Sequence, residues 1–547
     1  MSGFVEGTTL GDLVLRAAER HGDRVAVVFP ERAATFRELA DASLEIARGL
    51  IALGVERGDH VGIFMPNSFE MIHALFGAAL TGAVVCPVNA RYKAAELRYV
   101  IENADHRVLL TSDLADEHVD FPGLVHNAFP ALAEADPERL ELPVAPALRQ
   151  VVLFGERQVP GMLSRERLRE LAATVSPATV DERRACVRLR DEGVILYTSG
   201  TTANPKGCVI THEAIVRSAL AVGEREELTA DDVVWDPLPL FHTSGLQPLM
   251  HCLDVGALFV CMTHFEPDAA LVQIREHRPT VIKAIFMPVM AAIVNHPDFR
   301  LVDHEAIRIA AVIGPPDTVR LVYDAFPNAV VEGAYGLAEG GGYVATNAMD
   351  ETEEQQLYTI GPPYPGILVR TMDAETGELL PPGVAGELVV KGFSTMERYH
   401  KDPERTAEVL PPDGWLRTGD RGVVRADKRI EFIGRMKEMI RVGGENVGPQ
   451  EIEGFLSTHP AVHLVQAVGI PDARLDEVAA AFVELKPGAT ATEEELIAYC
   501  RGQIANFKVP RYVRFIDEWP MSATKIQRFR LRDQLIAELG LEPLRRP

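Results

Sequence analysis

Residues 197–207 have the side chains most suited to chemistry. They read Tyr-Thr-Ser-Gly-Thr-Thr-Ala-Asn-Pro-Lys-Gly and follow the apolar run 194–196. A strand that leads into backbone amides, hydroxyl groups and a lysine supplies the donors that a polyphosphate needs. A polar surface loop would explain the glycines and Pro205, but not the run of hydroxyl groups. We therefore predict a phosphate site made by Thr198, Ser199, Gly200, Thr201, Thr202 and Lys206.

The size and charge of the chain limit what surrounds this loop. With 547 residues the chain is too long for one hydrophobic core, and two to four domains are expected. A formal charge of −24 argues against nonspecific binding to nucleic acid or to an anionic membrane surface. The six cysteines are scattered without a C-x-x-C pair, which suggests neither a disulfide framework nor a zinc site and fits a reducing cytoplasm.

The sequence gives no sign of membrane insertion. The first residues have no basic region leading into an apolar core, so no signal peptide is expected. Residues 71–88 are nearly free of charge, but they contain His73 and break at Thr81 and Gly82 before a β-branched run that Pro87 ends. We interpret them as a buried helix followed by a buried strand, without integral membrane association.

The first 190 residues alternate strand and helix signals, although 112–190 are less regular. An apolar strand at 61–65 precedes Asn67, a potential N-cap with Glu70 completing a capping box into a helix at 71–80. A strand at 83–88 and a helix at 94–101 follow, and strand signals resume at 194–196, 258–262, 281–286 and 309–313. This order predicts an α/β fold with layered, mostly parallel sheets and helices on their faces.

The pattern changes twice in the second half of the chain. From Gly361 the strands are shorter and turn residues denser, which predicts a small β-rich subdomain over 361–434. Beyond Gly434, helices at 449–456 and 493–500 and strands at 462–470 and 478–485 predict a compact α+β unit of normal domain size. We expect an N-terminal domain of residues 1–434 and a C-terminal domain of residues 435–547.

The loop at 197–207 also resembles the phosphate loop of the adenylate-forming superfamily, which includes acyl-CoA synthetases, luciferases and the adenylation domains of peptide synthetases. Other segments resemble this family in the same order along the chain, and the similarity extends from about Asp59 to Arg528. They are 239–245, 332–339, 414–420, 434–440, 443–449 and 520–528. The resemblance implies an acyl-CoA synthetase with a smaller, mobile C-terminal domain.

The resemblance implies that ATP and Mg²⁺ are bound. Tyr335 offers a flat ring to the adenine, and Glu339 offers a hard oxygen to Mg²⁺, together with Thr201. Asp420 would accept both ribose hydroxyls, and Arg435 would reach the ribose or a phosphate. Further nucleotide contacts are implied for Gly314, Glu332, Gly333, Ala334 and Gly336.

For the acid, the resemblance places His242 near the substrate carboxylate as a gate and hydrogen-bond partner. The other implied pocket residues are Thr243, Ser244, Gly245, Met287, Gly340 and Gly341. The candidate pocket segments are mostly apolar or small, without an unpaired basic residue for a second carboxylate, so we predict a hydrophobic monocarboxylic acid of aromatic, alicyclic or medium acyl type. An amino acid is disfavoured, because residues 235–237 do not place Asp236 convincingly for an ammonium group.

The C-terminal segments imply the catalytic lysine and the route of the thiol. Lys525 would bridge the carboxylate and the α-phosphate as pyrophosphate leaves. Lys437 lies where the family hinges its domains, and Gly443 and Gly444 would line the tunnel for the pantetheine arm of coenzyme A. The implied partners are thus the acid, ATP and CoA, in a monomer or a homodimer.

Three positions depart from the family pattern: Ala203, Ala338 and Thr524 replace the usual Gly, Thr and Gly. Two alternatives therefore stay open beside the full synthetase. One is an adenylation-only enzyme that hands acyl-AMP to a carrier protein or a partner enzyme. The other is a non-catalytic homologue that binds the nucleotide.

Overall fold

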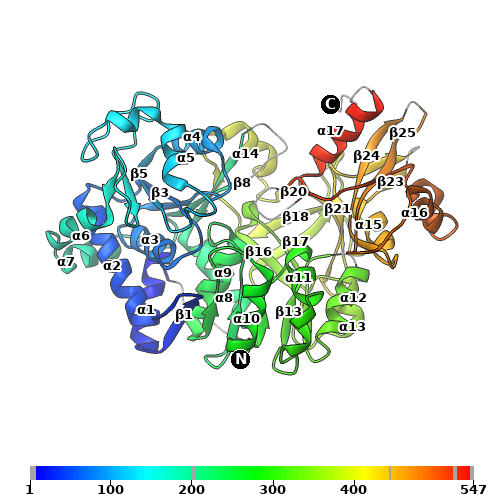
Figure 1. Ribbon diagram of the computed structural model, residues 1–547, viewed down its shortest axis with the longest axis horizontal. Coiled ribbons are helices and arrows are strands. Elements are labelled where there is room, and N and C mark those ends of the chain that lie inside the picture. Colours follow the sequence, from blue (N-terminus) through cyan, green and yellow to red (C-terminus); the bar gives the residue numbers. More distant parts are fainter. Residues whose placement is uncertain are drawn as a thin grey trace.

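The computed structural model describes residues 8–198, 204–314, 316–442, 445–472, 474–521 and 526–541. An eight-stranded sheet has the order β19-β9-β8-β4-β3-β5-β6-β7 (Figure 1). Its pairs from β8 to β7 are parallel, whereas β9 pairs antiparallel with both β8 and β19. The strands are β3 (His60–Phe64), β4 (Val84–Pro87), β5 (His106–Ser112), β6 (Gln150–Phe154), β7 (Leu163–Ser164), β8 (Glu192–Thr198), β9 (Lys206–Thr211) and β19 (Arg398–Tyr399).

A second, seven-stranded sheet has the order β14-β13-β12-β10-β11-β1-β2. All its pairs are parallel except β1 with β2. The strands are β1 (Val25–Phe29), β2 (Arg32–Thr35), β10 (Val233–Trp235), β11 (Leu258–Val260), β12 (Val281–Ile282), β13 (Ile309–Ala311) and β14 (Val330–Glu332). The α/β class with mostly parallel sheets is thus confirmed.

Three helices lie between the two sheets: α3 (Phe69–Leu80), α8 (His212–Arg225) and α9 (Thr243–Val255). Their buried apolar side chains share one core cluster with strands of both sheets. Every residue of α3 is buried, which explains why the apolar run 71–88 needs no membrane. Within the described ranges, no helix has the length and apolar character needed to span a bilayer.

The start of α3 corrects one sequence prediction. Ser68, not Asn67, is the N-cap, because its side chain accepts from the amide of Met71. The side-chain amide of Asn67 instead donates to the carbonyl of Leu238, at 2.9 Å, and its oxygen accepts from the amide of Leu240, at 2.8 Å. Asn67 therefore fixes the segment that leads to His242.

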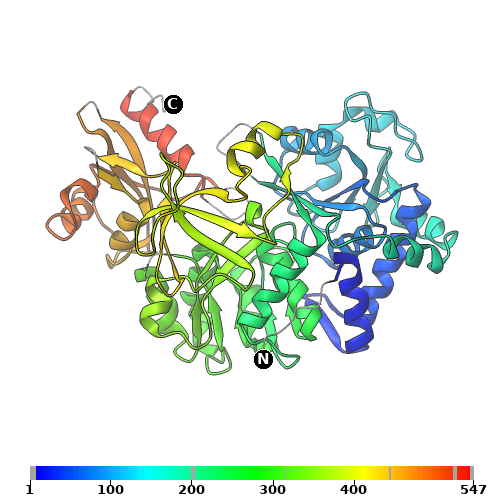
Figure 2. The same cartoon turned by 180° about the vertical axis from the view of Figure 1, so that it is seen from behind.

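The other helices of the described N-terminal part lie in the connections between strands, except α1, which precedes β1. They are α1 (Leu10–His21), α2 (Phe36–Ala52), α4 (Ala94–Asn103), α5 (Phe121–Ala128), α6 (Arg165–Ala173), α7 (Pro177–Ala185), α10 (Pro267–His277), α11 (Met287–Val294), α12 (Pro316–Ala325), α13 (Glu353–Tyr358) and α14 (Pro403–Val409). Figure 2 shows the same arrangement from behind.

Two antiparallel sheets follow the seven-stranded sheet in the chain. Strands β15 (Ala334–Leu337) and β16 (Gly342–Thr346) form a pair. A four-stranded sheet of order β17-β18-β20-β21 contains β17 (Ile367–Met372), β18 (Gly386–Gly392), β20 (Leu416–Val424) and β21 (Ile430–Arg435).

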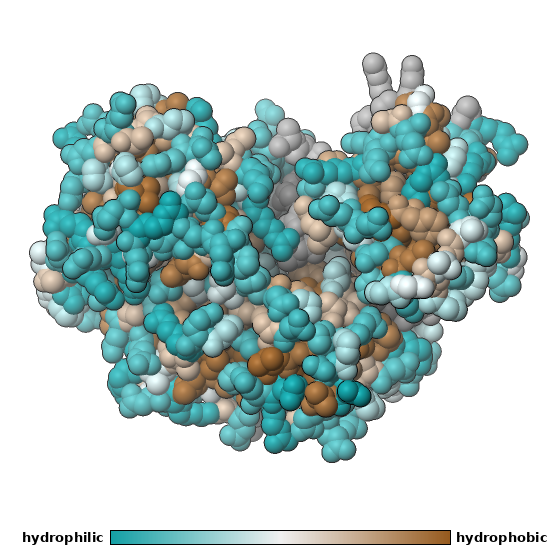
Figure 3. All heavy atoms as spheres, in the orientation of Figure 1, coloured by the Kyte–Doolittle hydropathy of each residue, from teal (hydrophilic) through white to brown (hydrophobic). Residues whose placement is uncertain are grey.

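The last sheet forms a separate lobe. Its strands are β22 (Ile440–Val442), β23 (Glu445–Val447), β24 (Val462–Asp472), β25 (Asp476–Leu485) and β26 (Tyr512–Phe515). Helices α15 (Pro449–Ser457) and α16 (Glu493–Cys500) contribute to one apolar cluster, and α17 (Arg528–Leu539) contributes to another. The surface is hollowed between this lobe and the lobe that carries α4 and α5 (Figure 3).

Candidate active site

The two ends of the predicted phosphate loop meet in an antiparallel pair. Thr198, the last residue of β8, is opposite Lys206, the first residue of β9. The loop is therefore the connection of a hairpin, which is how Lys206 returns beside Thr198. Of the other predicted phosphate contacts, Ser199, Gly200, Thr201 and Thr202 lie outside the described residues, as does Ala203.

One tyrosine that the sequence analysis missed lies between two predicted site residues. The Nζ atom of Lys206 lies 5.2 Å from the ring centroid of Tyr399. The hydroxyl of Tyr399 donates a 2.7 Å hydrogen bond to Oε1 of Glu339. Nothing in the sequence marks Tyr399, because it reaches the site only through the antiparallel pairing of β19 with β9, where it is opposite Cys208.

Glu339 has the properties of a magnesium ligand. Glu339 follows Ala338 in a short 3₁₀ turn, its side chain is half-buried, and its charge acts on Arg435. Mg²⁺ prefers one or two carboxylates completed by substrate phosphates and water. The described part of the chain holds no cluster of three His, Cys, Asp or Glu side chains that could bind a metal. Glu339 thus fits a cation that phosphate oxygens help to hold.

Three strands converge on Asp420, the predicted ribose ligand. Asp420 and Arg435 are opposite each other in β20 and β21, and Nε of Arg435 lies 3.2 Å from Oδ1 of Asp420. The Tyr335 hydroxyl, from β15, donates to Oδ2 at 3.0 Å. Burial, and then the charge of Asp420, raise the pKa of Tyr335 well above its usual value, so the phenol stays a neutral donor.

The remaining predicted nucleotide contacts lie near these strands. The amide of Gly333 donates to Oδ1 of Asn347 at 2.7 Å, and Ala334 and Gly336 belong to β15. Gly314 is exposed shortly after β13. The carboxylate of Glu332 is buried, with Oε2 at 2.5 Å from Nζ of Lys283. Glu332 therefore offers a nucleotide only its backbone.

His242 is the N-cap of α9. The amide of Ser244 donates to Nδ1 of His242 at 3.4 Å. Since Nδ1 accepts, the proton of a neutral ring is on Nε2, which can donate to a carboxylate. Thr243 and Ser244 form the buried first turn with Gly245, where an added Cβ would lie 2.6 Å from the carbonyl oxygen of Leu238. Only glycine fits there.

The predicted acid-pocket glycines lie beside α9. The Gln247 side chain donates to the carbonyl of Gly341 at 2.9 Å and accepts from the amide of Tyr343 at 3.0 Å. Gly341 has φ +80°, and a Cβ would lie 2.2 Å from the carbonyl oxygen of Ser394. Gln247, which the sequence analysis did not identify, therefore joins the helix of His242 to the segment containing Gly340 and Gly341.

The residues that flank the segment containing Lys525 lie beside Met287, a predicted acid-pocket residue. Met521 and Ile526 form an antiparallel bridge, whereas Lys525 and Thr524 lie outside the described residues. Met521 and Ile526 line a cavity of about 690 Å³ together with Met287, the first residue of α11. The bridge therefore lies next to a predicted pocket residue.

Lys437 is exposed in the connection between β21 and β22. Gly443 and Gly444, predicted for the CoA tunnel, lie outside the described residues.

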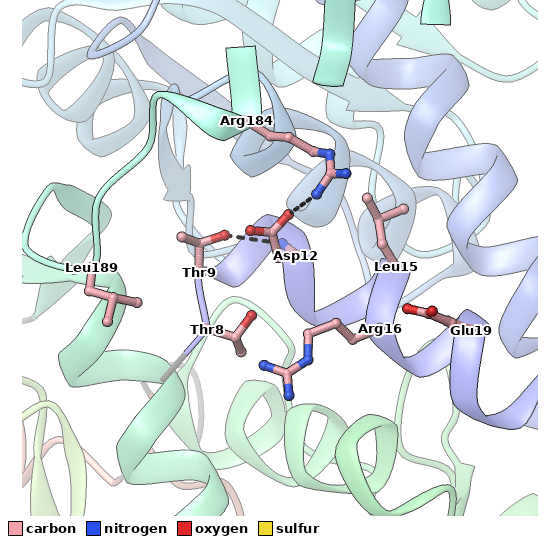
Figure 4. A pocket seen from close by; sticks show the side chains of 8 residues that line it. All are labelled: Thr8, Thr9, Asp12, Leu15, Arg16, Glu19, Arg184 and Leu189. Carbon is pink, nitrogen blue, oxygen red and sulfur yellow. Dashed lines mark hydrogen bonds and ion pairs between the residues drawn. The ribbon is translucent and has the colours of Figure 1, made fainter. Parts of the chain in front are cut away.

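A separate hollow of about 400 Å³ lies between α1 and residues 184–189 (Figure 4). Nη1 of Arg184 lies 2.8 Å from Oδ1 of Asp12, whose amide donates to Oγ1 of Thr9 at 3.2 Å. None of its lining residues belongs to the site described above, and we assign it no role.

The chain is similar to known enzymes. The AMP-binding enzyme family matches residues 14–400, and the AMP-binding enzyme C-terminal domain matches residues 451–525. YngI of Bacillus subtilis (strain 168), a presumed acyl-CoA synthetase, is 34% identical over 98% of both chains. The mitochondrial medium-chain acyl-CoA ligase ACSF2 of Mus musculus is 31% identical over 98% of this chain and 88% of its own.

Among solved structures, the anthranilate CoA ligase AuaEII in complex with anthranoyl-AMP superimposes with a TM-score of 0.85 at 25% identity, over 98% of each chain. The prediction made from the sequence motifs is confirmed: the chain belongs to the AMP-binding enzyme family and, within this adenylate-forming superfamily, to the acyl-CoA synthetases.

Proposed function

We propose that this acyl-CoA synthetase joins a hydrophobic monocarboxylic acid to coenzyme A. A carboxylate is a poor electrophile, because its leaving group would be oxide. Attack of the carboxylate oxygen on the α-phosphorus of ATP forms acyl-AMP and releases pyrophosphate. The CoA thiol then attacks the acyl carbon, AMP leaves, and a thioester forms. The observation that carries the proposal is a chain of contacts: Tyr399 lies between Lys206 and Glu339, and Arg435, which pairs with Asp420, also feels the charge of Glu339.

Each residue has one role in this scheme. Asp420, held by Tyr335 and Arg435, accepts the ribose hydroxyls. Lys206 and the hydroxyl loop hold the β- and γ-phosphates. Glu339, with Thr201, holds Mg²⁺, which neutralises phosphate charge when bound. Nε2 of His242 donates to the acid, and Lys525 bridges the carboxylate and the α-phosphate.

We further propose that residues 1–434 and 435–547 are two domains that turn about Lys437 between the half-reactions. The sheet containing β21 and the sheet containing β22 are separate, and the exposed Lys437 connects them. A polar, exposed residue can change its backbone angles in water at little cost. The turn withdraws Lys525 and brings Gly443 and Gly444 to the path of the thiol.

The acid class follows from the pocket and the relatives. Gly245, Gly340 and Gly341 allow the segments of the predicted pocket to pack closely, and Met287 adds an apolar side chain. The relatives include a medium-chain acyl-CoA ligase and an anthranilate CoA ligase, which supports a medium acyl or aromatic acid. We also propose that the enzyme works in a reducing cytoplasm, since all six cysteines are free thiols. We propose a monomer or a homodimer.

The test scores both half-reactions over a panel of carboxylic acids with Mg²⁺-ATP. Pyrophosphate release is measured without CoA, and acyl-CoA by mass spectrometry with CoA. Lys525→Ala should abolish pyrophosphate release while still converting supplied acyl-AMP and CoA to the thioester. Lys486→Ala, which changes an exposed lysine of the same lobe, is the matched control.

Two outcomes would contradict the proposal. Acyl-AMP that persists after CoA is added would indicate an adenylation-only enzyme. ATP binding without pyrophosphate release for any acid would indicate a non-catalytic homologue.

A further inference from the structure

A row of charged side chains crosses the C-terminal edge of the seven-stranded sheet. Strand pairing places Trp235 beside Ile282, and Ala311 beside Glu332. The ladder continues one residue further, since the amide of Lys283 donates to the carbonyl of Trp235. Asp236, Lys283, Ala311 and Glu332 therefore occupy one row.

This row faces α8 and α9. Alternate residues of a strand point to opposite faces, and Trp235 and Ile282 lie in the apolar cluster on the other face. The side chain of Lys283 also points toward α8, because its Nζ lies 2.5 Å from Oε1 of Glu226, the C-cap residue of α8. The row, Glu226 and Tyr343 of β16 together form a buried polar layer.

The polar layer holds three carboxyl groups and one cation. Nζ of Lys283 forms ion pairs with Oε1 of Glu226 and Oε2 of Glu332, each at 2.5 Å. Asp236 accepts one hydrogen bond, from the amide of Leu238, and its Oδ2 has no partner among the described residues. The hydroxyl of Tyr343 is also buried without a described partner. Oε2 of Glu226 and Oε1 of Glu332 also lack a described partner. Buried polar groups are nearly always paired, so these atoms require a partner from a ligand or from water.

Burial disfavours the charged form of both groups. Burial raises the pKa of Asp236 well above its usual value, and Leu238 and Lys283 offset this only in part. Burial raises the pKa of Tyr343 likewise, and the next cause is the charge of Asp236, followed by Glu332 and Glu226. Strand β16, which contains Tyr343, packs against α8 and α9, so Tyr343 lies on the side of the sheet that the row faces.

The polar layer begins where the glycine segment of the acid pocket ends. That segment starts after Glu339, at the phosphate end, and passes Gly340 and Gly341 to Tyr343. Gln247 holds it against the helix of His242. Tyr343 thus lies beside the helix that begins after His242.

We infer that Asp236 and Tyr343 form the far end of the acid site and bind a hydroxyl or uncharged amino group that the acid carries opposite its carboxylate. This inference rests on the proposed function. A second carboxylate is excluded, because three carboxyl groups already share the layer and its only described cation is paired twice. An unsubstituted acid would leave both buried groups without a hydrogen-bond partner, which lowers its kcat/KM relative to the substituted acid.

The experiment uses matched acids in the pyrophosphate-release assay. The aromatic set is benzoate, para-hydroxybenzoate, para-aminobenzoate and terephthalate. The aliphatic set is octanoate, omega-hydroxyoctanoate and octanedioate. In at least one set the hydroxy or amino acid should exceed the unsubstituted acid about tenfold or more in kcat/KM, and the diacid should be the poorest substrate.

Two variants test the residues. Tyr343→Phe removes only the hydroxyl and should lower the ratio of substituted to unsubstituted acid by about tenfold. Asp236→Asn should lower the same ratio. Tyr364→Phe is the matched control, because the buried hydroxyl of Tyr364 already donates to Oγ1 of Thr346 at 3.0 Å. Thermal unfolding of each variant separates lost selectivity from lost folding.

A wild-type preference for the unsubstituted acids would overturn the inference. So would an unchanged ratio in a folded Tyr343→Phe enzyme, which would mean that water alone fills the layer. Both results leave acyl-CoA synthesis intact, whereas failure of the proposed function would abolish pyrophosphate release for every acid.

Discussion

The hydroxyl of Tyr399 donates a 2.7 Å hydrogen bond to Glu339, and the same ring lies 5.2 Å from Nζ of Lys206. Burial raises the pKa of Tyr399, and the charge of Glu339 raises it further, so the phenol donates at every physiological pH. Tyr399 therefore orients the carboxylate proposed to hold Mg²⁺ and packs beside the lysine proposed to hold phosphate.

Tyr399→Phe should weaken the response to magnesium. A hydrogen bond to a charged group contributes about 1.5–3 kcal/mol. We expect a value near the lower end of this range, because the side chain of Glu339 is only half-buried. We expect the Mg²⁺ concentration for half-maximal pyrophosphate release to rise several-fold, with the acid KM unchanged. A magnesium titration at saturating ATP measures this. The same titration of Tyr364→Phe should match wild type, and an unshifted curve for Tyr399→Phe would refute the role.

Asp420→Asn should weaken ATP binding. The side-chain nitrogen of asparagine cannot accept a hydrogen bond from Tyr335, Arg435 or a ribose hydroxyl. Its NH₂ group would therefore face another hydrogen-bond donor. The KM for ATP should rise about tenfold or more, which corresponds to about 1.4 kcal/mol. Steady-state kinetics with varied ATP measure the change. Asp427→Asn, in the exposed turn between β20 and β21, should leave the KM for ATP unchanged.

Glu226 should make stability depend on pH. Burial, and then the charge of Glu332, raise the pKa of Glu226 from 4.5 to about 8, against the opposing effect of Lys283. Because the folded state binds the proton more tightly than the unfolded chain, the free energy of unfolding falls as pH rises from 4.5 to about 8. The slope from one group is at most about 1.4 kcal/mol per pH unit.

Glu226→Gln should remove this contribution. Denaturant unfolding at several pH values measures it as the difference in unfolding free energy between wild type and variant. That difference should fall up to about pH 8 and stay flat above it. The pKa of Lys283 is also raised above its usual value of 10.5. Its contribution to the free energy of unfolding is constant below that value, so it does not change between pH 4.5 and 8. A difference that does not vary with pH would show that Glu226 is ionised in the folded protein.

Gly341→Ala should disturb both stability and the acid site. The position has φ +80°, and the new Cβ would lie 2.2 Å from the carbonyl oxygen of Ser394. Gly383 has φ +85° with nothing within 4 Å, so Gly383→Ala isolates the backbone strain, about 1–2 kcal/mol. Gly341→Ala should cost clearly more in denaturant unfolding and should also raise the acid KM. Equal costs for the two variants would contradict the close approach.

Much of the fold could be predicted because its signals are local. The helix at 493–500 agrees with α16, and the helix at 94–101 lies within α4, since their patterns are periodic and bounded by turn residues. The region 112–190, whose elements the sequence did not define, contains β6, β7 and α5 to α7. Asn67 was wrongly expected to cap α3, because a capping pattern does not reveal that a tertiary partner will take the side chain.

The sequence alone determined the family, the order of the motifs and the chemistry they imply, because each motif is a short run of residues with fixed spacing. The tertiary structure decided which distant residues meet. Tyr399 reaches Glu339 through the pairing of β19 with β9, and the row of Asp236 and Lys283 exists only because parallel strands end in register. Strand order and register depend on contacts between segments far apart in the chain, and local patterns carry no record of them.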